Sequence, residues 1–206
     1  MRLLIAMMIS YVIGSIPTAY IYGRLYKGID IRQHGSGNVG ATNVFRVLGK
    51  GPGITVLLID IVKGIIPVVF IADVFHLHSH FDFVLLSVCV IAGHNWTVFL
   101  QFKGGKGVAT SLGALIGLTI KIASIRPVLV MTIIVWIICF LISTIVSFSS
   151  ILAAVFLPIF MVLTQQSFEL VFLGIIFCLF VVIRHRPNIK RLLSGQEPRV
   201  LLFKKK

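Results

Sequence analysis

Residues 53–73, GITVLLIDIVKGIIPVVFIAD, decide the fold class of this chain. The stretch is charged only at Asp60, Lys63 and Asp73, and its continuous length matches the roughly 20 residues that an α-helix needs to cross a bilayer. A strand buried in a parallel sheet is much shorter, usually about 5–6 residues. We therefore predict a membrane-spanning helix at this position.

Further apolar blocks of similar length predict more helices of the same kind. Of the 206 residues, 58% are hydrophobic and 12% are charged, whereas soluble domains carry about 25% charged residues. We predict an all-α integral membrane protein, a single bundle of about seven transmembrane helices that forms one domain over residues 1–206. The expected helices cover residues 3–23, 54–73, 82–100, 107–124, 127–145, 148–165 and 168–184.

The first apolar block has an alternative interpretation as a signal peptide. Its one basic residue, Arg2, precedes an apolar core, as in a secretory leader. However, the apolar character continues to Gly23, and the positive flank of Arg24 and Lys27 follows the block. The pattern favours a transmembrane helix.

The basic residues predict the orientation of the helices. With seven spans, fifteen of the 19 Lys and Arg residues fall on one side, three fall on the other, and Lys63 lies within a span. Because Lys and Arg accumulate in cytoplasmic loops, the N-terminus is predicted outside and the C-terminus in the cytoplasm. The tail FKKK, residues 203–206, suits the anionic inner leaflet. The net charge of +13 is divided among loops, so no nucleic-acid partner is expected.

Residues 34–43, HGSGNVGATN, contain the glycine pattern G-x-G-x-x-G of dinucleotide-binding folds, and Asp60 lies twenty positions after Gly40. Such a fold needs an apolar strand before the first glycine, but residues 26–34, YKGIDIRQH, are too polar. The glycines instead predict a cytoplasmic anion-binding loop with Arg46 as a planar phosphate ligand. The alternative is a solvated loop that obeys the positive-inside rule. The candidate residues are Gly35, Ser36, Gly37, Asn38, Thr42, Asn43 and Arg46.

A second candidate site lies in residues 93–110, GHNWTVFLQFKGGKGVAT. Gly104, Gly105 and Gly107 surround Lys106 where the fourth predicted helix begins. Glycines, a lysine and a helix N-terminus together predict a phosphate site. The stretch is no Walker A loop, because Leu100 stands where that loop has glycine.

A third stretch, residues 184–198, RHRPNIKRLLSGQEP, follows the last predicted span. His185, Asn188, Arg191 and Glu197 are its candidate functional residues. The alternative is a basic tail that touches anionic lipid, which would account for Lys190 and Arg199 but less well for Asn188 and Glu197. No acidic cluster suited to Mg²⁺ accompanies these stretches, so neither a metal nor another cofactor is expected.

The same three stretches resemble the PlsY family, the bacterial acyl-phosphate-dependent glycerol-3-phosphate acyltransferases. The family pattern GSGNxGATNxxR is matched by residues 35–46, GHxxPxFxxFKGGKGxAT by residues 93–110, and RHxxNIxRLxxGxE by residues 184–197. One departure is Thr97, where the family usually has proline, and it could alter a local bend.

The resemblance implies transfer of a fatty acyl group from acyl phosphate to the sn-1 hydroxyl of glycerol 3-phosphate. The products are lysophosphatidic acid and phosphate, and the reaction is the first acylation of bacterial phospholipid biosynthesis. It further implies a multi-pass protein of the inner (cytoplasmic) membrane with a cytoplasmic active site. The H-x4-D signature of acyl-CoA-dependent acyltransferases is absent after His94 and His185.

Each candidate residue then receives an expected role. Lys106 and the N–H groups of the neighbouring glycines would hold the acyl phosphate, and Ser36, Arg46 and Asn188 would orient the glycerol phosphate. His94, His185 and the substrate's own phosphate are alternative proton acceptors. The expected catalytic residues are Ser36, Arg46, Lys106, His185 and Asn188. The expected substrate-binding residues are Gly35, Gly37, Asn38, Thr42, Asn43, His94, Gly104, Gly105, Gly107 and Arg191. Glu197, Asp60 and Lys63 are expected to give structural support, the last two as a pair inside the bundle.

Two rival functions follow from the same features. A transporter of phosphorylated metabolites would also need basic residues, but along a path between both faces, and the predicted external face has only three. A phosphatidyl- or sugar-phosphate transferase would need acidic clusters that the sequence lacks.

Overall fold

The computed structural model describes residues 1–200, and this part of the chain is helical with no β-strand. It divides into two compact units, Met1–Lys121 and Ile122–Lys206, each with its own packing. The predicted lipid contact of residues 203–206 lies outside the described residues. The all-helical fold class is confirmed, whereas the single domain remains a prediction.

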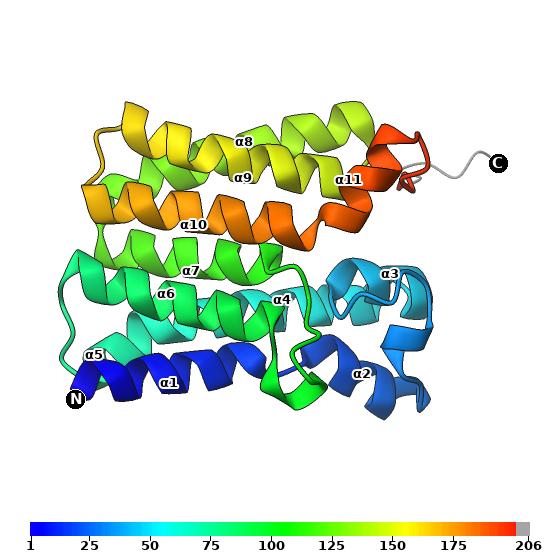
Figure 1. Cartoon of the computed structure of the whole chain (residues 1–206), viewed down its shortest axis with the longest axis horizontal. Coiled ribbons are helices and arrows are strands. Elements are labelled where there is room, and N and C mark those ends of the chain that lie inside the picture. Colours follow the sequence, from blue (N-terminus) through cyan, green and yellow to red (C-terminus); the bar gives the residue numbers. More distant parts are fainter. Residues whose placement is uncertain (201–206) are drawn as a thin grey trace. The chain divides into compact units, whose positions relative to one another are not determined.

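The first unit contains two pairs of closely packed helices (Figure 1). α6 (His80–Asn95) lies between α1 (Arg2–Ser15) and α7 (Val108–Lys121), and α4 (Lys50–Ile66) packs against α7. The remaining elements are α2 (Thr18–Lys27), η1 (Ile31–Gln33), α3 (Ala41–Leu48), η2 (Pro67–Ile71), α5 (Ala72–Val74) and η3 (Val98–Leu100). The α5–α6 connection lies at the opposite end of this unit from α2 and α3 (Figure 1).

Glycines allow the helices of the first unit to approach closely. A Cβ on Gly14 would collide with the backbone of Val90, which joins α1 to α6. A Cβ on Gly113 would collide with the carbonyl oxygen of Ile61, which joins α7 to α4. Helices in lipid gain no hydrophobic driving force when they associate. Small residues at such crossings allow the close van der Waals packing that holds the helices together instead.

The second unit consists of α8 (Arg126–Ser143), α9 (Val146–Leu163) and α10 (Phe168–Arg184), preceded by the short η4 (Ala123–Ile125). α9 packs against both α8 and α10. After Arg184 the chain bends by 64° into α11 (Arg186–Leu193), where Pro187 occupies the first turn. Proline suits this position because the N–H groups of a first helical turn have no partner within the helix.

Two expected helices are interrupted at prolines. Residues 3–23 form α1 and α2, separated at Ile16 and Pro17, because a residue before proline is pushed out of the α region and Ile16 has a ψ of 113°. Pro67 begins a π-helical turn, η2, within the second expected helix. Proline lacks the N–H that an α-helix would use, and the wider turn accommodates that loss.

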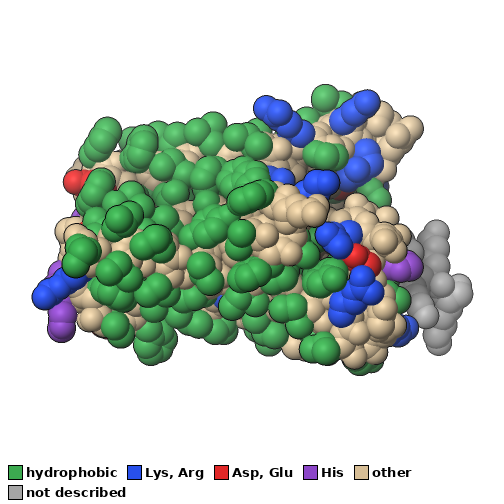
Figure 2. Space-filling model, turned by 60° about the horizontal axis from the view of Figure 1, so that its bottom comes forward, with side chains coloured by type: hydrophobic (Ala, Val, Ile, Leu, Met, Phe, Trp, Pro, Cys, Tyr) green, Lys and Arg blue, Asp and Glu red, His purple; other side chains and the backbone are tan. Residues whose placement is uncertain are grey.

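Five helical segments among the described residues are long and apolar enough to cross a membrane, or six if α10 and α11 count as one bent span. α7 has 14 residues and rises about 21 Å, short of the roughly 30 Å hydrocarbon core. Exposed hydrophobic side chains cover most of the face seen in Figure 2, as expected of lipid-facing helices. Seven spans and an external N-terminus remain predictions.

Candidate active site

The loop that carries the first motif, residues 35–46, rests on a small apolar core of its own. This core lies under the loop and joins it to α2, α3 and α4. Its buried members are Ala19, Ile31, Val39, Val44, Leu48, Val56 and Leu100. The apolar contacts give a polar, glycine-rich loop a defined position at one end of the first unit.

The buried side chain of Asn43 shapes this loop from within. Its Oδ1 accepts a hydrogen bond from the N–H of Ser36 at 2.8 Å, and its Nδ2 donates to the carbonyl oxygens of Ile31 and His34 at 3.2 and 3.0 Å. Gly35 has a φ of +62°, and a Cβ there would collide with Asn43 Oδ1. The amide of Asn43 is thus engaged inside the loop rather than turned toward a substrate.

Asp30 fixes the start of the same loop, a role that the sequence analysis missed. Its Oδ1 caps η1 by accepting from the backbone N–H of Arg32 at 3.0 Å, and its Oδ2 lies 2.7 Å from Arg32 Nη2. These hydrogen bonds and the charge of Arg32 outweigh burial and lower the pKa of Asp30 to about 2. A capping acid followed by arginine two positions later was the available signal.

Ser36, Thr42 and Arg46 remain exposed on the surface of this loop and of α3. Asn38 and Gly37 are half-buried, and Gly37 has a φ of +71°. The polar groups expected to meet a substrate therefore lie on the outside of the loop, and those that build it lie inside.

The glycines of the second motif pack against the end of α6. The N–H of Gly104 donates to the carbonyl oxygen of Asn95 at 3.2 Å, and that of Gly105 donates to His94 at 3.0 Å. In this conformation each of the two N–H groups already has a backbone partner, and the expectation that they bind phosphate remains a prediction. A Cβ at either position would collide with α6. These glycines are required for close approach, and Gly107, with a φ of +77°, for the turn into α7.

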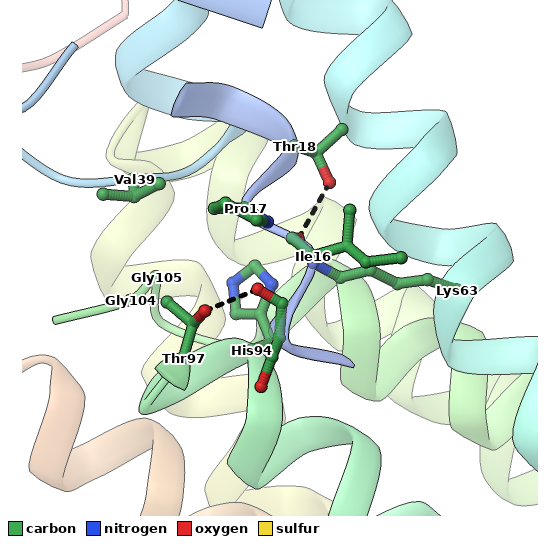
Figure 3. Close-up of a pocket in the computed structure, with 10 residues that line it drawn as sticks. Ile16, Pro17, Thr18, Val39, Lys63, His94, Thr97, Gly104 and Gly105 are labelled. Carbon is green, nitrogen blue, oxygen red and sulfur yellow. Dashed lines mark hydrogen bonds between the residues drawn. The ribbon is translucent and has the colours of Figure 1, made fainter. Parts of the chain in front are cut away.

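The loops of the first and second motifs meet in the first unit. A Cβ on Gly105 would lie 2.7 Å from the carbonyl oxygen of Val39, so the two backbones are in direct contact. A small pocket opens beside this contact, with the imidazole of His94 near its centre (Figure 3). Its lining residues are Ser15, Ile16, Pro17, Thr18, Val39, Lys63, His94, Thr97, Gly104 and Gly105.

Thr97 has a specific partner in place of the proline expected from the resemblance. Its Oγ1 donates a short hydrogen bond to the carbonyl oxygen of Ser15 and accepts one from the N–H of Phe99 at 3.2 Å. The threonine thereby caps η3 and attaches it to the end of α1. The threonine therefore links η3 and α1 at this corner of the pocket.

The third motif lies in the second unit, where Glu197 organises it. The Glu197 carboxylate accepts hydrogen bonds from Ser147 Oγ at 2.7 Å, from Asn188 Nδ2, and from Arg191 Nε at 2.7 Å. Burial opposes ionisation of Glu197, but these three hydrogen bonds outweigh it and lower the pKa. His185 is buried and donates from Nδ1 to the carbonyl oxygen of Val181 at 2.8 Å.

The fold and these loops define the class: an integral membrane protein with a glycine-lined, lysine-bearing pocket at one end of its first unit. A sequence profile of the family described as glycerol-3-phosphate acyltransferase matches residues 4–195. The chain belongs to this family, and it is an acyltransferase.

Individual relatives and solved structures agree with this assignment. The glycerol-3-phosphate acyltransferase of Synechococcus sp. (strain JA-2-3B'a(2-13)) is 44% identical over 197 residues, which cover 96% of this chain and 94% of that protein. The one from Desulforamulus reducens is 43% identical over 190 residues, covering 91% and 90%. The crystal structure of PlsY, an integral membrane glycerol 3-phosphate acyltransferase, in its glycerol 3-phosphate form superposes with a TM-score of 0.87 at 36% identity, covering 98% of this chain and 96% of that one.

Proposed function

We propose that this acyltransferase uses acyl phosphate as donor and acylates the sn-1 hydroxyl of glycerol 3-phosphate, giving lysophosphatidic acid and inorganic phosphate. The reaction would be the first acylation of bacterial phospholipid synthesis, at a site facing the cytoplasm from the inner membrane. The observation that carries the proposal is the contact of two glycine-rich motif loops at Val39 and Gly105, with Lys106 beside it.

The solved relatives support both the acceptor and the product. PlsY has been crystallised in a glycerol 3-phosphate form and, with a TM-score of 0.85 to this chain, in a lysophosphatidic acid form. Both molecules carry a phosphate, for which a loop with Arg46 and a turn with Lys106 are suitable ligands.

A donor with a fatty chain is supported by the surroundings of the second motif. Val98, Phe99 and Phe102 lie within the five residues before Lys103, and their side chains are 48%, 57% and 59% exposed. An exposed apolar cluster next to basic residues suits a reactant whose chain lies in lipid and whose phosphate lies in water.

The chemistry needs no covalent enzyme intermediate. Acyl phosphate is a mixed anhydride and is already activated. The glycerol hydroxyl oxygen would attack the acyl carbon, forming the ester bond, while the bond from that carbon to the phosphate oxygen breaks and phosphate leaves. The hydroxyl proton passes to a base. Lys106 would offset the charge that builds on the acyl and phosphate oxygens.

The other predicted residues would orient the acceptor. Ser36 and Arg46 would bind glycerol 3-phosphate from the first loop. For Asn188 and Arg191, a role toward the acceptor rests on the resemblance of the third motif to its family pattern. In the described structure Asn43 and the N–H groups of Gly104 and Gly105 have partners within the protein, so we assign them to building the site.

Three groups remain candidates for the proton acceptor: His94, His185 and the phosphate of the substrate. Because Nδ1 of His185 donates to a carbonyl, Nε2 is the nitrogen of the neutral ring that carries the lone pair and could accept a proton. Replacing each histidine by glutamine and measuring kcat against pH separates the three. Loss of the acidic limb of the profile in one variant identifies that histidine, and its retention in both variants identifies the phosphate.

The donor assignment is tested with purified protein in detergent, given labelled glycerol 3-phosphate and either palmitoyl phosphate or palmitoyl-CoA. We expect labelled lysophosphatidic acid from palmitoyl phosphate alone. Product from palmitoyl-CoA alone would contradict the proposed donor. The Arg46→Ala variant serves as the control for activity from contaminating enzymes.

A further inference from the structure

α4 carries a buried ion pair beside the candidate site, and one member of the pair, Lys63, lines the pocket. Lys63 Nζ lies 2.8 Å from Asp60 Oδ1, and the two side chains are 5% and 3% exposed. Such a pair is weak evidence for stability, because apolar residues of similar size often serve a fold equally well. The other contacts of Asp60 and Lys63 indicate why this pair is present.

Each member of the pair also holds the break between α1 and α2. Thr18 Oγ1 donates to Asp60 Oδ1 at 2.9 Å, and Lys63 Nζ donates to the carbonyl oxygen of Ile16 at 2.9 Å. Ile16 and Thr18 flank Pro17, where the helix is interrupted. The pair thus satisfies a carbonyl group that the interrupted helix leaves without a helical partner.

Asp60 additionally faces the imidazole of His94, whose Nδ1 lies 3.7 Å from Asp60 Oδ1. On the opposite side of the ring, Nε2 lies against Gly105, where a Cβ would collide with it. The ring is therefore held between a buried carboxylate and the turn that carries Lys106. The carbonyl of Val39 from the first motif touches Gly105 as well.

We propose that Asp60 is a positioning residue of the active site, which acts through His94 to hold the Gly104–Gly105 turn, and with it Lys106, against the loop of the first motif. This role rests on the proposed function. Lys63 neutralises the carboxylate and attaches the assembly to the α1–α2 break. Asp60 itself touches no reacting atom.

Charge-neutral replacement of the pair distinguishes positioning from simple stability. Asp60→Leu with Lys63→Met leaves no unpaired buried charge, and the carbonyl oxygen of Ile16 still accepts from the N–H of Thr18 at 3.0 Å. We therefore expect an unfolding temperature close to that of the wild type. We expect kcat to fall at least about 20-fold, because the turn is no longer held in place. The matched control is the Asp73–Lys121 pair at the other end of the unit, where Asp73→Asn with Lys121→Met should leave kcat unchanged. Normal kcat in the Asp60→Leu, Lys63→Met variant overturns the proposal.

A conservative variant covers the case in which that double replacement does not fold. Asp60→Asn and His94→Gln are measured singly and together. If both act as one unit, the combined loss of kcat stays close to that of the worse single variant. Losses that multiply overturn the proposal.

Hydrogen exchange supplies a readout that does not depend on turnover. In Asp60→Asn, amides of residues 103–108 should exchange at least about tenfold faster than in the wild type, while the Asp73→Asn control should leave them unchanged. Unchanged exchange at residues 103–108 in Asp60→Asn contradicts the positioning role. A different outcome is that Asp60→Asn exchanges faster at residues 103–108 although the wild type transfers no acyl group. That outcome would contradict the proposed function but not the positioning role of Asp60.

Discussion

Gly105 lies against Nε2 of His94 so closely that no side chain could stand at position 105. The contact explains why this turn is rich in glycine: the backbone must pass between the end of α6 and the loop of the first motif. The N–H groups of Gly104 and Gly105 donate hydrogen bonds to backbone carbonyl oxygens at the end of α6. The turn thus presents Lys106 from a backbone that is hydrogen-bonded to α6 and does not form an open nest of N–H groups.

Gly105→Ala should lower kcat/KM about 100-fold, because the added methyl group displaces His94 or Val39 and moves Lys106. Gly51→Ala is the matched control. A Cβ at position 51 meets nothing within 4 Å, and alanine favours the α4 helix in which it lies. Steady-state assays of both variants check this prediction, and equal activity of the two would contradict it.

Arg46→Ala should abolish most of the activity while the protein stays folded, since the Arg46 side chain is exposed and outside the apolar core of the loop. We expect a loss of about 100-fold or more in kcat/KM, mainly through binding of glycerol 3-phosphate. Arg46→Lys should recover only part of it, because an ammonium cannot bind phosphate through two parallel hydrogen bonds. Wild-type kinetics in Arg46→Ala would refute the assigned role.

Lys106→Ala should reduce kcat more than it weakens binding of glycerol 3-phosphate, because its charge is proposed to act on the acyl phosphate. We expect a loss of about 100-fold in kcat. Lys50→Ala, at the exposed start of α4, is the control and should lose little. The assignment fails if the two lysine variants behave alike.

Glu197→Gln should both destabilise the second unit and reduce activity, because the carboxylate accepts from Ser147, Asn188 and Arg191 together. Charge-assisted hydrogen bonds contribute about 1.5–3 kcal/mol each to stability, and an amide weakens or inverts them. Ser147→Ala removes a single neutral donor and should have the smaller effect on both kcat and the unfolding temperature. The reverse order would contradict the central place of Glu197.

Acid should loosen the first loop through Asp30. The folded pKa of about 2 lies below the ordinary value of 3.8. Ionised Asp30 therefore stabilises the folded state fully above about pH 4, and this contribution is lost as the pH falls toward 2. Unfolding temperatures of the wild type and Asp30→Asn, measured from pH 5 to pH 2.5, should converge at the acid end. Parallel curves would exclude Asp30 as the cause.

Much of this architecture was predictable from sequence, because long apolar blocks leave few alternatives to spanning helices. The three motifs were also recognisable in the sequence, and the roles of their residues remain predictions. The interrupted first helix was not, although Pro17 was the signal, because proline is common in membrane helices and only tertiary partners such as Lys63 determine whether it ends one. Hydrogen-bond partners could not be predicted from the sequence either. The sequence suggests Asn43 as a substrate ligand, but in the structure its side chain is buried and hydrogen-bonded within its own loop. The spacing of residues in the sequence does not show which polar side chains form hydrogen bonds within the protein itself.

Proteoliposomes give the most direct test of the central claim, that a one-sided membrane site transfers an acyl group to glycerol 3-phosphate. Liposomes that contain the protein and palmitoyl phosphate receive labelled glycerol 3-phosphate from outside and are then washed and extracted. We predict that the label enters the organic phase as lysophosphatidic acid. Label trapped in the lumen as unchanged glycerol 3-phosphate, with none in the lipid, would contradict this account and indicate a transporter.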